Sequence, residues 1–213
     1  MKFLISALVL LSSVQAKSGV TKAGDGGHAV ICRTFQSDGP LPTYTIELFD
    51  LYLMRIRFGK QSLMNQTTAV ASQNRVFLCS YMKKLEVRMN RHVHDARITQ
   101  AFSKACTIGN EARFVNDFNR EDLSSVTIPL PSNCSLQQIA KIDLSKPETT
   151  IELDYSIAES LGFAEYSALM LHESLHTVFE NHDLIRKLVG YAVASERFQS
   201  DTADTLNRQL LQP

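Results

Sequence analysis

The chain has 213 residues, no formal net charge, and hydrophobic side chains at 44% of its positions. Because the sequence pI is near 7.0, no charge excess favours nucleic acid or an anionic membrane surface as a partner. The length suffices for one domain with a sizeable core.

The first residues have the pattern of a secretory signal peptide. Met1-Lys2 is followed by an apolar run from Phe3 to Leu11 and then by the small and polar segment Ser12–Ala16. The apolar run is too short for a membrane span. We therefore expect residues 1–16 to be removed and residues 17–213 to form a single exported domain, periplasmic or secreted.

The first half of this domain contains a predicted strand and two predicted helices. His28–Cys32 follows a glycine-rich turn and is predicted to be a strand. Ile46–Arg57 and Val76–Met89 carry apolar residues at helical spacing, which predicts two amphipathic helices. The pair His92 and His94 could bind metal from a strand, but no second ligand cluster lies nearby, so we interpret it as solvent-exposed surface.

The second half is predicted to mix a strand with a helical hairpin. Ser135–Lys141 is interpreted as a short helix or turn, and the alternation over Thr150–Tyr155 predicts a half-buried strand. Two helices are then expected, over about Ala164–Glu180 and Leu184–Phe198. The predicted fold is α+β, with a small mixed or antiparallel sheet and a C-terminal helical hairpin.

Four cysteines remain after the predicted cleavage site. An even number in an oxidising compartment indicates two disulfides, and the sequence leaves all three pairings open. A cysteine metal site is disfavoured because no two cysteines have CxxC spacing. The four candidates are Cys32, Cys79, Cys106 and Cys134.

The predicted hairpin carries the pattern HExxH, at residues 172–176. On a helix, residues four apart lie on one face, so the imidazoles of His172 and His176 can bind one Zn²⁺. Glu173 follows the first histidine directly and could act as general base toward a water on the metal. The alternative is a buried core helix whose histidines form hydrogen bonds to their neighbours.

A catalytic zinc site usually has three protein ligands, and the candidates for the third follow the motif in the sequence. Glu196 lies twenty residues after His176, in register with the apolar face of the next predicted helix, where a carboxylate needs a partner. His182, six residues after His176, is the alternative. This spacing resembles that of metzincins, which carry a glycine where this chain has Phe179 and a Met-turn further on, whereas no methionine follows Met170 here. Glu196 is therefore our preferred ligand.

The motif and its flanks resemble the zincin superfamily of metallopeptidases, and the Glu196 spacing is similar to that of gluzincins. The resemblance covers roughly thirty residues. It implies a Zn²⁺ cofactor, a peptide or protein substrate, and peptide hydrolysis with Glu173 as the base. It also suggests that the strand at Thr150–Tyr155 is an edge strand that pairs with substrate, with Glu152 and Asp154 facing outward to favour basic residues.

Most of the domain also resembles a group of uncharacterised exported bacterial proteins. The similar stretches are Gly24–Cys32, Leu48–Leu53, Pro129–Ala140 and Ala168–Gly190, the last of which ends in Arg-x-Leu/Ile-Val-Gly. In that group the position of His176 is not always histidine. This resemblance keeps a second reading open, in which the chain is a non-enzymatic, envelope-associated binding protein and its HExxH helix is structural.

Overall fold

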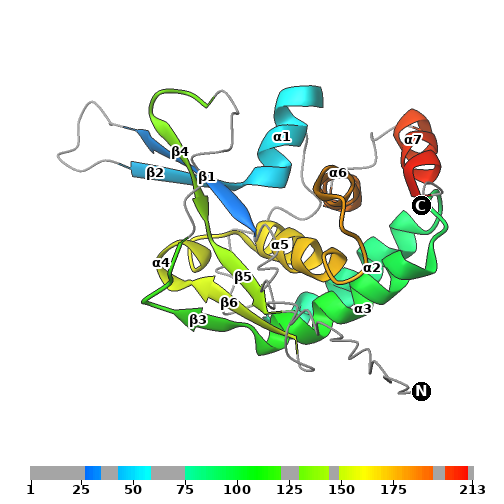
Figure 1. Cartoon of the computed structure of the whole chain (residues 1–213), viewed down its shortest axis with the longest axis horizontal. Helices are drawn as coiled ribbons and strands as arrows, with labels where there is room; N and C mark the ends of the chain where they lie inside the picture. Colours follow the sequence, from blue (N-terminus) through cyan, green and yellow to red (C-terminus); the bar gives the residue numbers. More distant parts are fainter. Residues whose placement is uncertain are drawn as a thin grey trace, which may run out of the picture.

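The computed structural model describes residues 27–34, 43–58, 75–120, 130–143, 149–193 and 200–210. In these ranges lie seven helices and two three-stranded sheets, which confirms the predicted α+β fold (Figure 1). No described helix is long and apolar enough to span a membrane. The predicted signal peptide lies outside the described residues.

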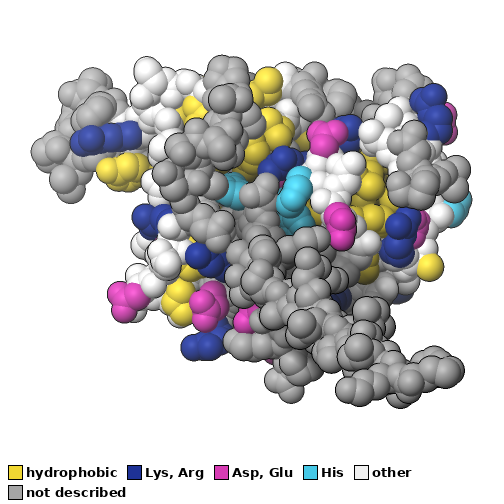
Figure 2. All heavy atoms as spheres, viewed as in Figure 1, with side chains coloured by type: hydrophobic (Ala, Val, Ile, Leu, Met, Phe, Trp, Pro, Cys, Tyr) yellow, Lys and Arg dark blue, Asp and Glu magenta, His cyan; other side chains and the backbone are white. Residues whose placement is uncertain are grey.

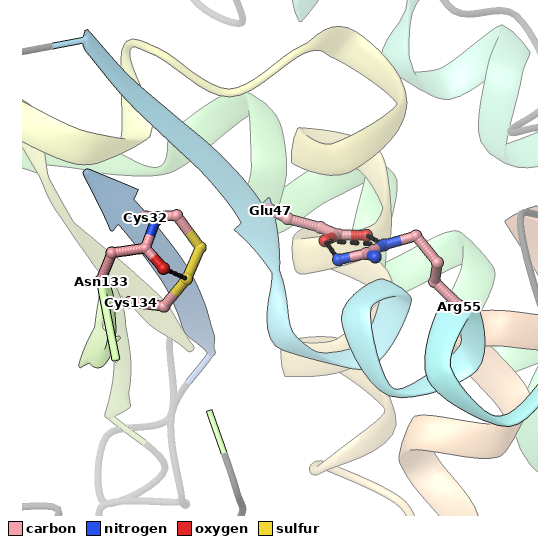
Figure 3. A network of polar contacts seen from close by, with 5 residues as sticks. All are labelled: Cys32, Glu47, Arg55, Asn133 and Cys134. Atoms are coloured by element: carbon pink, nitrogen blue, oxygen red, sulfur yellow. Dashed lines mark hydrogen bonds and ion pairs between the residues drawn. A yellow bond between two sulfur atoms is a disulfide. The ribbon is translucent and has the colours of Figure 1, made fainter. Parts of the chain in front are cut away.

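The first sheet is antiparallel, with β1 (His28–Thr34) between β2 (Thr43–Leu48) and β4 (Cys134–Gln138). The helix predicted from Ile46 begins only at α1 (Phe49–Phe58). The residues before Phe49 form β2 instead, because Thr-Tyr-Thr-Ile is rich in strand formers and pairs with β1 along its length. In Figure 3, Arg55 of α1 reaches back to Glu47 of β2, with Nη2 2.7 Å from Oε2.

The second sheet is mixed, and the predicted strand lies at its centre. β6 (Thr150–Asp154) is parallel to β3 (Arg113–Val115) and antiparallel to β5 (Ala140–Asp143). The interpretation of Ser135–Lys141 as a helix or turn is wrong, because β4 and β5 occupy this stretch and both pair with neighbouring strands.

Two expectations about β6 are also wrong. It cannot be an edge strand, because β3 and β5 occupy both of its sides. Asp154 does not face outward: its side chain is 3% exposed, forms an ion pair with Arg120, and accepts a hydrogen bond from Ser156 N at 3.0 Å. It thereby caps the short helix α4 (Tyr155–Ala158). No substrate strand can pair there, so the expected preference for basic substrates loses its basis.

The helices pack around α5 (Phe163–Leu175), which carries the motif. α3 (Ala96–Glu111) packs against both α5 and α2 (Leu78–Met89), and α6 (His182–Val193) packs against α5 and α1. All residues of α5 except Glu165 are buried, so the HExxH segment belongs to the core. Figure 1 shows α5 in the middle of the molecule, and α7 (Ser200–Leu210) close to the C-terminus.

The four cysteines form two disulfides, Cys32–Cys134 and Cys79–Cys106, and the prediction of two bridges is confirmed. Cys32 and Cys134 lie opposite each other on β1 and β4, where the register pairs them directly (Figure 3). Cys79 and Cys106 join α2 to α3. Such bridges persist in oxidising compartments and are consistent with an exported protein.

Candidate functional site

The motif helix ends earlier than the sequence predicts. Its last residue is Leu175 rather than Glu180. Val178 N and Phe179 N both donate to Leu175 O, at 3.0 and 2.8 Å, and the Thr177 hydroxyl donates to Ser174 O at 2.7 Å. These bonds satisfy the carbonyl groups that a helix end leaves open, so no glycine is needed. The objection that Phe179 raised against His182 therefore does not apply.

The early end of α5 turns the chain back and brings His182 to His176. α6 begins at His182, where Asn181 Oδ1 accepts a hydrogen bond from Leu184 N at 3.0 Å and caps the helix. The ring centroids of His176 and His182 are 4.9 Å apart. We call His172, His176 and His182 the histidine cluster. His176 and His182 are half-buried, and histidine side chains reach the surface near the middle of the face in Figure 2.

Inside the cluster, the two motif histidines face each other through their Nε2 atoms. These atoms are 2.9 Å apart. On the far side of its ring, His172 Nδ1 lies 2.6 Å from Oδ2 of Asp50, a buried residue of α1. Since a carboxylate accepts, Nδ1 carries the hydrogen, and Asp50 fixes the orientation that points Nε2 at His176.

The surroundings give the two histidines opposite proton affinities. Burial acts to lower the pKa of His172, but the charge of Asp50 and its hydrogen bond outweigh burial, and the pKa is raised. The pKa of His176 falls to about 2, because of burial and then of His172 and His182 nearby. His176 is therefore neutral, and its Nε2 lone pair accepts the hydrogen on His172 Nε2.

Glu173 is fully buried and bridges α5 to the start of β1. Its Oε1 accepts a hydrogen bond from Gly27 N, while its Oε2 has no hydrogen-bond partner among the described residues. A Cβ at Gly27 would lie 2.0 Å from Leu169 Cδ1 and 2.9 Å from Glu173 Oε1, so a larger residue would have to displace these side chains. Burial raises the pKa of Glu173, against the opposing effects of His172 and of the Gly27 hydrogen bond.

Segments that are far apart in the sequence meet at this site. Gly27 precedes β1, Asp50 lies on α1, and Glu173 and the histidine cluster lie on α5 and α6 or beside their ends. Sequence reasoning missed Asp50, because it lies 122 residues before His172 and no local pattern marks it.

The structure brings together only part of the predicted ligand set. Glu196 lies outside the described residues. Within the described ranges, no group of three or more His, Cys, Asp or Glu side chains is arranged so that it could hold a metal ion. Two donor nitrogens converge, at His172 and His176, and the ring of His182 is their neighbour. His92 and His94 are exposed, as predicted.

Comparisons with known proteins add no further constraint. No family model, curated protein or solved structure matches the chain. Any functional assignment must therefore come from the site itself.

Proposed function

We propose that this chain is an exported zinc-dependent metallopeptidase in which His172 and His176 hold the metal. One observation carries the proposal: the two Nε2 atoms face each other at 2.9 Å while Asp50 binds Nδ1 of His172. A carboxylate behind a histidine is the usual support of a metal ligand. A core helix needs no such convergence of two imidazoles.

The donor pair fits a zinc ion. Two nitrogens bound to one tetrahedral zinc at about 2.0–2.1 Å lie about 3.3 Å apart, so a small outward movement of either ring makes room. Zinc would replace the hydrogen between the two Nε2 atoms, and this hydrogen would leave as a proton. His182 is the third ligand that we propose, because its ring is 4.9 Å from that of His176. It would have to rotate to present a nitrogen. Glu196 remains the alternative.

The roles of the chain's own residues follow from their contacts. A zinc ion there would act as a Lewis acid and lower the pKa of water. Glu173 is the proposed general base: Gly27 N–H fixes its Oε1, and its Oε2 is left to accept the proton of the attacking water. Asp50 keeps His172 in the orientation that directs its Nε2 toward His176.

The second candidate is an exported binding protein in which the HExxH helix is structural. One observation favours it: Glu173 is 0% exposed and its hydrogen bond to Gly27 ties α5 to β1. A residue with this role needs no substrate. In this case the histidine pair would be a buried polar network whose members satisfy one another.

Metal analysis of the purified mature protein tests the proposal. We expect about one zinc per chain, because the sequence contains one HExxH motif. His172→Ala should remove the zinc, while His92→Ala, at an exposed site, should leave it unchanged. Loss of zinc in His182→Ala but not in Glu196→Ala would support our choice of third ligand. Metal-free protein from a zinc-supplemented preparation would contradict the proposal.

Glu173→Gln then separates the base from the ligands. Glutamine keeps the volume and an oxygen for Gly27 N–H but cannot take up a proton at neutral pH. Zinc content should therefore stay near that of the unmodified protein while hydrolysis of a casein or peptide library disappears. Unchanged hydrolysis would exclude Glu173 as the base.

A further inference from the structure

Arg186 is a partly exposed cation beside the histidine cluster. It extends from α6 one turn after His182, and its side chain is 23% exposed. Its Nε lies 3.8 Å from Asp50 Oδ1, which is too long for a hydrogen bond. This Nε forms no hydrogen bond with any other described residue. The donors of its guanidinium are therefore not used up by Asp50.

The packing of α6 on α1 holds this guanidinium in place. A Cβ at Gly190 would lie 1.8 Å from Met54 Sδ, so glycine lets the two helices touch. One turn before that contact, Arg186 Cζ lies 5.2 Å from the centroid of the Phe49 ring. A guanidinium stacked on an aromatic ring keeps its orientation. The contact at Gly190 and the Phe49 ring together fix the position of a cation beside the site.

The guanidinium of Arg186 cannot itself be a ligand of the proposed zinc ion, because it is positively charged and has no lone pair to donate. It is not needed to orient Asp50, because Oδ2 of Asp50 already holds His172 at 2.6 Å. A fixed, partly exposed guanidinium instead suits an anion, and its planar donors match a carboxylate.

We propose that Arg186 binds a carboxylate of the peptide, so that the site selects peptides that carry a carboxylate close to the bond to be cut. The carboxylate is either the free C-terminus or an Asp or Glu side chain. The cleavage step rests on the function proposed above, but the binding of the carboxylate does not.

Binding to the full-length mature Glu173→Gln protein, loaded with zinc, tests this without hydrolysis. Calorimetry would compare an acetylated tetrapeptide with a free C-terminus, the same peptide amidated, and amidated peptides with one internal Asp or Asn. We expect one carboxylate peptide to bind about 10- to 100-fold more tightly than its amide partner. Which pair shows the preference identifies the source of the carboxylate.

Adding Arg186→Gln should abolish that preference and leave the affinity for the amides unchanged. Lys187→Gln is the matched control, because it removes one positive charge from the neighbouring residue. Lys187 forms an ion pair with Asp183, with Nζ 2.6 Å from Oδ2. The Lys187→Gln variant should keep the preference. Arg186→Lys preserves the charge and is the more conservative change, so it is less disruptive to folding. This variant should keep only part of the preference for the carboxylate peptide.

Equal affinity for acids and amides in the starting protein would overturn the proposal. The proposal would also be overturned if Arg186→Gln weakened the binding of the carboxylate peptide and of its amide equally, while thermal melting showed that the variant is folded. If the protein prefers the carboxylate peptide but binds no zinc, only the peptidase proposal is contradicted. If it binds zinc and hydrolyses peptides but shows no such preference, only the carboxylate proposal is contradicted.

Discussion

Asp50 is the residue on which the orientation of the histidine pair depends. It is 3% exposed and bonds to a histidine whose other nitrogen faces His176. Without it, His172 Nδ1–H would be left buried and unsatisfied, which costs about 1–3 kcal/mol. The ring could then turn to find another acceptor, and Nε2 would no longer face its partner.

Asp50→Asn should weaken zinc binding about 10- to 100-fold, because the amide keeps an acceptor but loses the charge that supports His172. Competition with a chelator of known affinity would measure this. Asp183→Asn is the control: it makes the same chemical change in the first turn of α6, where the side chain is 57% exposed. Equal zinc affinity in the Asp50 variant and the unmodified protein would contradict the prediction.

The sequence was sufficient to find the residues that are close in the chain, and insufficient for those brought together by folding. His172, Glu173 and His176 are recognisable because helical periodicity alone puts the two histidines on one face. Asp50 is 122 residues from His172 and carries no local pattern that marks it. His182 was ranked below Glu196 because Phe179 stands where the six-residue spacing usually has a glycine. α5 ends without that glycine at Leu175, five residues before the predicted end.

Among the helices, α5 shows how a terminus can respond to pH. Glu165 Oε2 accepts a hydrogen bond from Gly162 N at 3.1 Å and completes the cap of the helix. Glu165 is partly buried, and the loss of solvent around its carboxyl group raises its pKa to about 7, although the backbone hydrogen bond opposes the shift. The helix that carries the motif is therefore anchored by a carboxyl group that releases its proton near neutral pH.

The stability of the protein should fall between about pH 4.5 and 7 through this group. In that window the folded state keeps a proton on Glu165 that the unfolded state, with its ordinary pKa near 4.5, has released. Stability therefore decreases as pH rises and levels off above pH 7. Thermal melting of Glu165→Gln should show a weaker pH dependence over this range. Glu152→Gln, at a site with a 48% exposed side chain, should match the unmodified protein.

Helices and strands with a regular spacing of apolar residues were predictable from the sequence. Short strands, and helix ends that depend on capping hydrogen bonds, were not. α2 and β6 lie where periodicity placed them, at Leu78–Met89 and Thr150–Asp154. β4 and β5 are five and four residues long, and the pairs Gln137-Gln138 and Ile139-Ala140 break the alternation between them, so the stretch showed no continuous strand pattern. Pairing with β1 and β6 stabilises both strands. α3 was overlooked, although its Asp95 cap and its apolar positions from Ile98 to Ile108 were legible.

At the scale of the whole molecule, the two disulfides constrain very different lengths of chain. The cysteines of the Cys32–Cys134 bridge have a sequence separation of 102. Those of the Cys79–Cys106 bridge have a sequence separation of 27. A longer closed loop removes more entropy from the unfolded chain. The bridge between β1 and β4 should therefore be the more stabilising of the two.

Replacing each pair by alanine should show this order. The loop-entropy relation gives about 4.7 kcal/mol for the longer loop and about 3.6 kcal/mol for the shorter, a difference of about 1 kcal/mol. Urea unfolding of the two double variants would measure it. Thiol titration of the unmodified, denatured protein should find no free cysteine. Two or more reactive thiols, or the reverse order of stability, would contradict the arrangement.

The hydrogen bond between Glu173 and Gly27 joins residues 146 positions apart, so the site forms only after the whole segment between them has been synthesised and folded. A nascent polypeptide still emerging from the ribosome lacks α5 and α6, and an unfolded chain has no contact between α5 and β1. If the chain is a peptidase, this arrangement makes its activity depend on folding. An unfolded chain could not cleave the proteins that synthesise or transport it, and hydrolysis would begin only once β1 and α5 are in contact.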